Sequence, residues 1–168
     1  ALPQDHWLFA EHRTMSDVPT MPGTGFLDLV ISSRRLLGFK EGIELSDVFF
    51  LRPLQQRSAE ASDELTFAFV ESDGAFDFSV SSGATGRPNE HVVHVEGNAT
   101  PLETCDAATI DLEAIRTRCS QGHRPYLAEG YAAAQASAMR FGPRWNLIRE
   151  QFDGEGEALA RLELDQEF

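Results

Sequence analysis

The chain of 168 residues has few cysteines and no long apolar run. Cys105 and Cys119 provide neither a disulfide framework nor the four ligands of a structural zinc site, so we expect both to be reduced thiols. No apolar stretch approaches the roughly 20 residues of a membrane-spanning helix. The N-terminal segment carries Asp5 and His6, where a secretory signal would be apolar. These features predict a protein of the cytoplasm.

Positive charge is also scarce. The chain has 14 Lys and Arg residues against 27 Asp and Glu residues, which gives a formal net charge of −13. The average field of such a chain repels phosphate backbones and anionic lipid, so nucleic acid and membranes are poor partners. Apolar residues, in contrast, are plentiful: 42% of the residues are hydrophobic and 12 are Phe, enough for a folded core. The length fits one domain or a close-packed pair.

The first half of the chain predicts one helix. Prolines and glycines punctuate residues 18–25, and apolar residues then recur at helical spacing as far as Leu37. We expect a helix over about 25–37, because Thr24 can cap its first turn and Gly38 stands where a helix commonly ends.

After this helix the hydrophobic pattern changes to a period of two, which is typical of half-buried antiparallel strands. Four segments are rich in Phe, Val or Leu and form the expected sheet: 48–51, 65–69, 76–80 and 91–99. Asp73-Gly74 lies between the second and third segments and has the chemistry of a hairpin turn. The pattern predicts an α+β domain over residues 1–100.

The second half of the chain is less regular. We interpret 101–125 as a linker with one short helix that Asp111 caps. An Ala-rich helix is expected over 127–139, closed by Phe141-Gly142-Pro143. Two strands follow, joined by a glycine-containing turn: 147–152 and 157–164. Two strands are usually too few to stand alone, so 126–168 is predicted to be the incomplete start of a second domain.

Several motifs follow one another in a recognisable order: His6-Trp7-Leu8-Phe9-Ala10-Glu11-His12, Pro22-Gly23-Thr24-Gly25-Phe26-Leu27, Arg52-Pro53-Leu54, Phe78-Ser79-Val80-Ser81-Ser82, His94-Val95-Glu96-Gly97 and Phe141-Gly142-Pro143-Arg144-Trp145. With them the chain resembles, over most of its length, the dehydratase domains of modular polyketide synthases. The resemblance implies a double hot-dog fold, in which each half is a long helix wrapped by an antiparallel sheet. Residues 1–100 would form the first hot-dog, and 126–168 would begin the second.

The resemblance also implies a lyase activity. Such a domain removes water from a 3-hydroxyacyl thioester, carried on the phosphopantetheine of an acyl carrier protein, and leaves the 2,3-enoyl thioester. His12 would be the catalytic base. The other implied site residues bind the substrate: Pro22, Gly23, Gly25, Phe141, Gly142 and Pro143. No cofactor or metal is implied. The implied partners are the carrier protein, neighbouring synthase domains and a second copy of the synthase in a homodimer.

The chain departs from the family's usual pattern at particular positions. Ser16 replaces a glycine, and Pro22 follows His12 by one residue more than is usual. Phe141 replaces a tyrosine and therefore cannot donate a hydrogen bond. No residue matches the catalytic aspartate, whose helix is expected just after Phe168. These departures leave two alternatives open: the same fold catalysing double-bond migration or oxa-cyclisation, or a non-catalytic structural domain.

The residue types present suit part of this chemistry. Dehydration needs a base for the C2 proton, a donor that polarises the thioester carbonyl, and an acid for the departing hydroxyl. An imidazole can serve as the base because its unperturbed pKa, about 6.5, leaves much of it neutral. The glycine-rich helix start after Pro22 offers N–H groups and the positive end of a helix dipole. With His12, this helix start makes half of the required site.

Other candidate sites fit simpler interpretations. His91 and His94 are three residues apart on a strand, which puts them on opposite faces and disfavours a shared metal ion. We expect His94 to make a buried hydrogen bond instead. Ser81-Ser82-Gly83 lacks the neighbouring histidine and the strand-to-helix elbow of a serine hydrolase, so we expect a strand end and a loop there. Arg34-Arg35 is a candidate basic patch for docking an acidic carrier protein.

Overall fold

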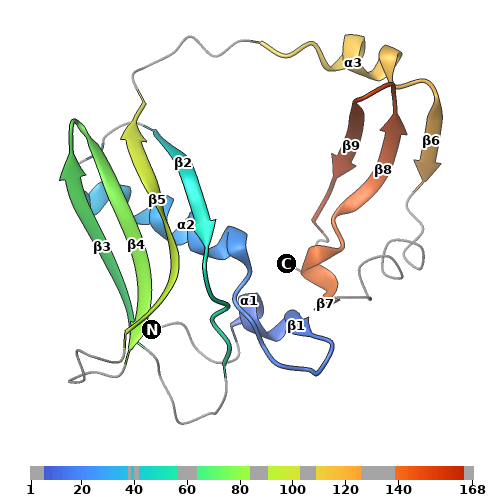
Figure 1. Ribbon diagram of the computed structural model, residues 1–168. Helices are drawn as coiled ribbons and strands as arrows, with labels where there is room; N and C mark the ends of the chain where they lie inside the picture. Colours follow the sequence, from blue (N-terminus) through green and yellow to red (C-terminus); the bar gives the residue numbers. More distant parts are fainter. Residues whose placement is uncertain are drawn as a thin grey trace. The chain divides into compact units, whose positions relative to one another are not determined.

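The computed structural model describes residues 6–37, 39, 42–56, 64–83, 91–102, 109–125 and 139–164 (Figure 1). Its backbone contacts divide the chain into two compact units. The first consists of Ala1–His12 and Val18–Cys105, and the second of Arg13–Asp17 and Asp106–Phe168.

The first unit is a helix packed on an antiparallel sheet. Helix α2 (Gly23–Ser33) runs behind the sheet in Figure 1 and continues into the 3-10 helix η1 (Arg34–Leu37). The sheet has the order β2-β5-β4-β3, and all its neighbouring strands are antiparallel. Its strands are β2 (Ile43–Phe50), β3 (Glu64–Ser72), β4 (Ala75–Gly83) and β5 (Val92–Pro101). A short helix, α1 (Trp7–Ala10), precedes them.

Helix α2 begins earlier than the sequence predicts. Its first residue is Gly23, so Thr24 lies inside the helix and the prediction that Thr24 caps it is wrong. Pro22 can stand directly before the helix because the first N–H groups of a helix have no intrahelical partner. Its carbonyl oxygen accepts a hydrogen bond from Gly25 N–H at 3.0 Å. The expected helix end at Gly38 lies outside the described residues.

The hairpin between β3 and β4 is formed as predicted. Ser72 pairs with Ala75, so the turn consists of Asp73 and Gly74. These residues have φ values of 49° and 81°. A two-residue hairpin turn whose twist matches its strands needs positive φ at both central positions, which Asp-Gly tolerates well. The predicted turn is therefore confirmed.

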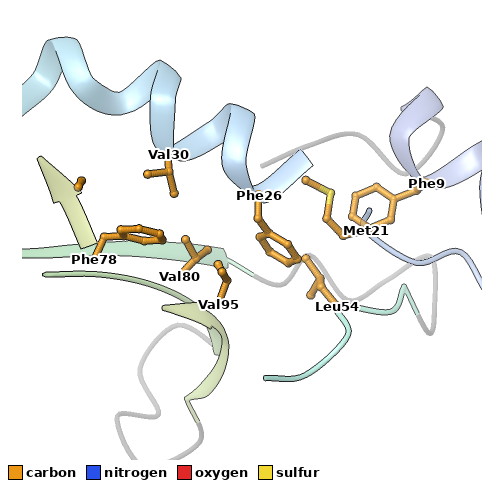
Figure 2. Packing of buried hydrophobic residues seen from close by; sticks show 9 residues of the cluster. Phe9, Met21, Phe26, Val30, Leu54, Phe78, Val80 and Val95 are labelled. Atoms are coloured by element: carbon orange, nitrogen blue, oxygen red, sulfur yellow. The ribbon is translucent and has the colours of Figure 1, made fainter. Parts of the chain in front are cut away.

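The core lies between α2 and the sheet. Figure 2 shows Phe26 and Val30 pointing from α2 toward Phe78, Val80 and Val95. The three valines are 0% exposed. Alternate apolar residues of β3 pack against this cluster: Leu65, Phe67 and Phe69. The period-two pattern of the sequence thus forms the core, as predicted, and the intervening residues of β3, such as Glu64 and Thr66, are exposed.

Strand β2 contains a bulge that decides where its last residues point. Its pairing with β5 shifts just before Phe49, and Asp47 within the bulge has a φ of 49°. Beyond the bulge, Phe49 pairs with Glu96 and Phe50 with Val95. Glu96 is exposed and Val95 is 0% exposed. Because paired side chains share a face of the sheet, Phe49 lies on the outer face and Phe50 on the face that carries the core.

The second unit contains a three-stranded antiparallel sheet in the order β6-β8-β9. The strands are β6 (Gly122–Pro125), β8 (Ile148–Asp153) and β9 (Ala158–Leu162). Helix α3 (Leu112–Arg118) precedes them, and the Asp111 carboxylate accepts a hydrogen bond from Ala114 N–H at 3.0 Å. The short strands β1 (His12–Thr14) and β7 (Met139–Phe141) form a separate pair, and the 3-10 helix η2 (Pro143–Trp145) follows β7.

Several elements in the second half of the chain agree with the prediction from the sequence. The helix cap at Asp111 and the strands predicted at 147–152 and 157–164 are confirmed. The segment 101–125, interpreted as a linker, contains α3 and β6. The predicted Ala-rich helix lies outside the described residues, apart from Met139. That residue begins strand β7 and does not end a helix.

Candidate active site

The imidazole of His12 is held in one orientation. His12 is half-buried at the start of β1, and its Nδ1 atom lies 2.7 Å from the carbonyl oxygen of Thr20. A carbonyl oxygen can only accept a hydrogen bond, so Nδ1 carries the proton and donates it. In the neutral imidazole the lone pair then resides on Nε2. This is the tautomer in which Nε2 can act as a general base.

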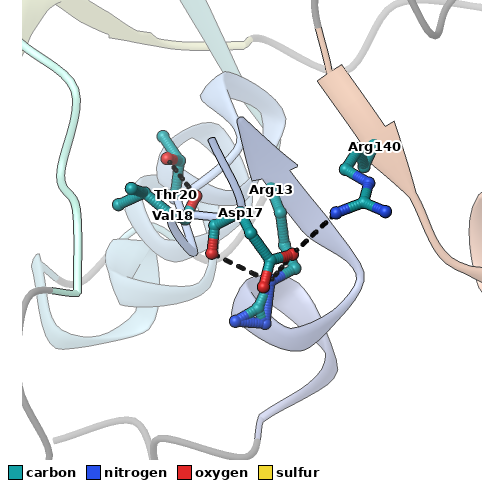
Figure 3. Close-up of polar contacts among 5 residues, drawn as sticks. All are labelled: Arg13, Asp17, Val18, Thr20 and Arg140. Atoms are coloured by element: carbon teal, nitrogen blue, oxygen red, sulfur yellow. Dashed lines mark hydrogen bonds and ion pairs between the residues drawn. The ribbon is translucent and has the colours of Figure 1, made fainter. Parts of the chain in front are cut away.

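The hydrogen-bond partner of the imidazole is itself fixed. Thr20 is 7% exposed, and its N–H donates to the carbonyl oxygen of His12 at 2.9 Å. Figure 3 shows its hydroxyl donating to the carbonyl oxygen of Val18, at 3.1 Å. The next residue, Met21, donates its N–H to the carbonyl oxygen of Leu54 at 2.8 Å. The Arg52-Pro53-Leu54 motif thus holds the segment that orients His12.

The N-terminus of α2 follows immediately. Gly23 follows Thr20 by three positions, so the first helical N–H lies within about 10 Å of the oxygen that holds His12. The first N–H groups of a helix lack intrahelical partners and stand at the positive end of its dipole. Gly25 is buried, and a Cβ at this position would come within 2.8 Å of Met21 Cε. A base and an anion-stabilising helix end therefore occur together in the first unit.

The remaining predicted site residues belong to the second unit. Phe141 ends β7, Gly142 is the N-cap of η2 and Pro143 is its first residue. The ring of Phe141 lies 5.6 Å from that of Trp145 and is 36% exposed. Because His12 belongs to the first unit, the participation of these residues in one substrate tunnel stays a prediction.

A second histidine, His94, forms a buried polar pair that the sequence did not reveal. His94 is 3% exposed. Its Nδ1 atom lies 3.0 Å from the carbonyl oxygen of Arg52 and therefore donates to it. Its Nε2 atom lies 2.7 Å from Ser82 Oγ and accepts from that hydroxyl. The predicted buried hydrogen bond of His94 is confirmed. The expectation that Ser81-Ser82-Gly83 lacks a neighbouring histidine is wrong, because the pairing of β4 with β5 brings His94 to Ser82.

The outer face of the four-stranded sheet has a shallow depression of about 340 Å³. Phe49, Ala68, Ser79 and Glu96 are among the residues that line it. Ala68 on the edge strand β3 and Ser79 on the inner strand β4 are the small side chains of this lining. None of the predicted site residues lines this depression, so it is separate from the candidate active site.

The sequence also led to predictions about the cysteines, the basic pair Arg34-Arg35, metal ligands and membrane-spanning helices. Cys119 is a buried free thiol, and Cys105 lies outside the described residues, as do the side chains of Arg34 and Arg35. Within the described ranges, no three His, Cys, Asp or Glu side chains cluster as metal ligands would. None of the helices that the structure describes is both long enough and apolar enough to cross a membrane.

Comparison with known proteins shows which proteins share this fold. No protein-family model matches the chain. Over 165 residues it is 28% identical to the polyketide synthase GfsB of Streptomyces halstedii, a match that covers 94% of this chain and 3% of that synthase. The dehydratase domain of a trans-AT polyketide synthase from Brevibacillus brevis superposes with a TM-score of 0.83 at 19% identity, covering 99% of this chain and 58% of that one. The chain has the fold of a polyketide synthase dehydratase domain.

A further solved structure agrees with this fold. An inactive mutant of the CurJ dehydratase has a TM-score of 0.85 at 20% identity, and the match covers all of this chain, 100%, and 57% of that one. The chain thus spans a little more than half of the dehydratase domains that it matches, as expected for one hot-dog and part of another. The resemblance and the hot-dog fold class predicted from the sequence are confirmed.

Proposed function

We propose that the chain is part of a polyketide synthase dehydratase domain, which converts a 3-hydroxyacyl thioester into the 2,3-enoyl thioester. The observation that carries this proposal is the hydrogen bond from His12 Nδ1 to the Thr20 carbonyl, close to the start of α2. A general base and a helix N-terminus then occur together in a fold that known dehydratases share. His12 and the start of α2 define the proposed site, and the shared fold supports the proposed activity by analogy.

The proposed reaction is an elimination in which His12 Nε2 takes a proton from C2 of the acyl group. The electron pair of the broken C–H bond forms the C2–C3 double bond, and the C3–O bond breaks. Negative charge that develops on the thioester oxygen is stabilised by N–H groups at the start of α2, beginning with Gly23. The hydroxyl leaves as water after an acid protonates it.

The proposal assigns that acid to a part of the dehydratase fold that this chain does not span. The family uses an aspartate there, and no residue of this chain matches it. Without such an acid, a factor of about 10²–10⁴ in rate would be missing. Phe141, Gly142 and Pro143 would line the tunnel from the side of the second hot-dog.

The proposal also defines the partners. The acyl group would be carried on the phosphopantetheine of an acyl carrier protein, within a homodimeric synthase that supplies the neighbouring domains. Loss of water beside a thioester is proton chemistry, so the proposed reaction uses no nucleotide, redox cofactor or metal ion.

A second candidate function uses the same fold but gives a different product. Phe141 has no hydroxyl where the family has tyrosine, and this difference favours double-bond migration or oxa-cyclisation. Double-bond migration uses a base that removes a proton from C4, and oxa-cyclisation uses a base that removes the proton of the attacking hydroxyl. Both use a polarised carbonyl, so His12 and α2 could serve either reaction.

Product analysis separates these candidates. The synthase module that contains this chain would be supplied with a 3-hydroxyacyl thioester and, separately, with a hydroxy-enoyl thioester, and the products identified by mass spectrometry and NMR. Formation of the 2,3-enoyl thioester from the first substrate supports dehydration. A cyclic ether or a migrated double bond from the second supports the alternative. Recovery of both substrates unchanged favours a non-catalytic structural domain.

A further inference from the structure

Three consecutive large apolar residues end strand β2 and lead out of it. Phe49 is 57% exposed, Phe50 is 55% exposed and Leu51 is 49% exposed. A half-exposed Phe loses much of the stabilisation that complete burial would provide. Contiguous exposed apolar side chains mark binding sites, so the face of the sheet on which each of these residues lies decides what it can contact.

Phe49 and Phe50 have nearly equal exposure but opposite surroundings. Phe49 lines the outer depression beside Asp47 and Glu96, a surface with negatively charged side chains. Phe50 pairs with Val95 and so lies on the face of the sheet that carries the core. The bulge in β2 sets this division, because it fixes which residue of the strand faces outward.

The ring of Phe50 lies against the first residue of α2. A Cβ added to Gly23 would come within 3.0 Å of Phe50 Cε1 and 3.1 Å of Phe50 Cζ. The absence of a side chain at Gly23 therefore lets the ring approach the helix backbone. Phe50 is nevertheless 55% exposed, and its ring lies at the helix end where the proposed function places the thioester carbonyl.

We propose that Phe50 is a substrate-binding residue that contacts the carbons of the acyl chain next to the thioester. This inference rests on the proposed function. An acyl chain is flexible and apolar, and an aromatic ring offers it a rigid apolar surface with little entropy to lose. With the carbonyl oxygen at the N–H groups of Gly23, the neighbouring carbons lie over the ring that touches Gly23. Phe50 thus contributes to binding of the acyl group, whereas Phe49 does not.

The test compares Phe50→Ala with Phe49→Ala in the complete dehydratase domain. The two residues are adjacent on one strand and similarly exposed, so each substitution removes one phenyl ring of about the same exposure. Turnover of 3-hydroxyacyl-pantetheine thioesters with short and long acyl chains gives kcat and KM for each variant. Phe50→Ala is expected to raise KM roughly tenfold for both chain lengths with a smaller change in kcat, because the carbons next to the thioester occur in every acyl chain and a lost apolar contact weakens binding by about that factor. Phe49→Ala is expected to match the wild type.

A second variant, Phe50→Leu, keeps an apolar side chain and guards against misfolding. Its KM is expected to lie between those of the wild type and Phe50→Ala, with the same melting temperature as Phe49→Ala. Equal KM values for the Phe50 and Phe49 variants overturn the assignment, and so does a Phe50 effect that is confined to the long chain. If the wild-type domain turns over but the variants do not differ, only this inference fails. Absence of turnover in the wild type overturns the proposed function and this assignment together.

Discussion

The Nδ1 atom of His12 lies 2.7 Å from the carbonyl oxygen of Thr20. The acceptor is a backbone atom, so its position depends on how the segment before α2 is held. That segment is fixed by the Thr20 hydroxyl, which donates to Val18, and by Met21, which donates to Leu54. The orientation of the proposed base therefore depends on the Thr20 hydroxyl and on backbone hydrogen bonds of the segment before α2.

The Thr20 hydroxyl can be tested as a positioning group. Thr20→Val removes the hydrogen bond to Val18 but keeps the shape of the side chain. A small displacement of the Thr20 carbonyl misaligns His12, so kcat is expected to fall roughly ten- to a hundredfold with little change in KM. Thr20→Ser is expected to restore turnover. The imidazole ¹⁵N chemical shifts of His12 report the tautomer directly. Unchanged shifts and unchanged kcat in Thr20→Val would contradict this role.

The buried pair of Ser82 and His94 is expected to stabilise the first unit. Ser82→Ala leaves the buried Nε2 atom of His94 without its donor, at an expected cost of about 1–3 kcal/mol in the free energy of unfolding. The neighbouring Ser81→Ala serves as the control and is expected to change stability by less than about 0.5 kcal/mol. Urea unfolding measures both variants. Equal unfolding midpoints would show that the hydrogen bond to His94 contributes nothing.

The core is expected to be most sensitive at the residues facing α2. Phe78 is 2% exposed, and Phe78→Ala is expected to lower the free energy of unfolding by about 3–5 kcal/mol because it leaves a cavity under the helix. Val70 is 62% exposed on the outer face, so Val70→Ala is expected to have an effect of less than about 0.5 kcal/mol. Thermal unfolding followed by circular dichroism compares the two. A milder effect at Phe78 than at Val70 is incompatible with the core described above.

The second unit is expected to lose stability in acid. Hydrogen bonds from Gln151, and then from Arg124, lower the pKa of Asp153. A carboxyl whose pKa is lower in the folded chain stabilises it fully above the unfolded pKa, and this contribution disappears as the pH falls through the folded pKa. As the pH falls, amide protons of the β6-β8-β9 sheet are expected to lose protection from exchange. This loss is expected to be smaller in Asp153→Asn than in the control variant Glu155→Gln. Identical pH profiles for the two variants would exclude this contribution of Asp153.

Local features of the fold could be predicted from the sequence. Asp73-Gly74 was recognisable because positive φ at two successive positions is a local requirement, and Asp111 because a helix cap acts within three residues. The bulge at Asp47 was not predictable, since it depends on how β2 pairs with a distant strand. The direction of Phe50 follows from that bulge and was missed with it.

The candidate site also contains one feature that the sequence predicted and others that it did not. A lone histidine carries little signal by itself, so His12 was identified through the resemblance of its surrounding motif. Its partner is the backbone oxygen of Thr20, and no residue type marks a backbone acceptor in a sequence. The contact between Ser82 and His94 arises from strand pairing and likewise leaves no local trace.

The central claim is that His12 removes the C2 proton of a 3-hydroxyacyl thioester. Turnover of 3-hydroxyacyl-pantetheine thioester by the complete dehydratase domain, measured for the wild type, His12→Ala and His91→Ala, tests it most directly. His91 is an exposed histidine of the first unit and serves as the control. Loss of the base is expected to lower kcat by about 10²–10⁴-fold in His12→Ala, with His91→Ala equal to the wild type. Wild-type turnover in His12→Ala would contradict the account.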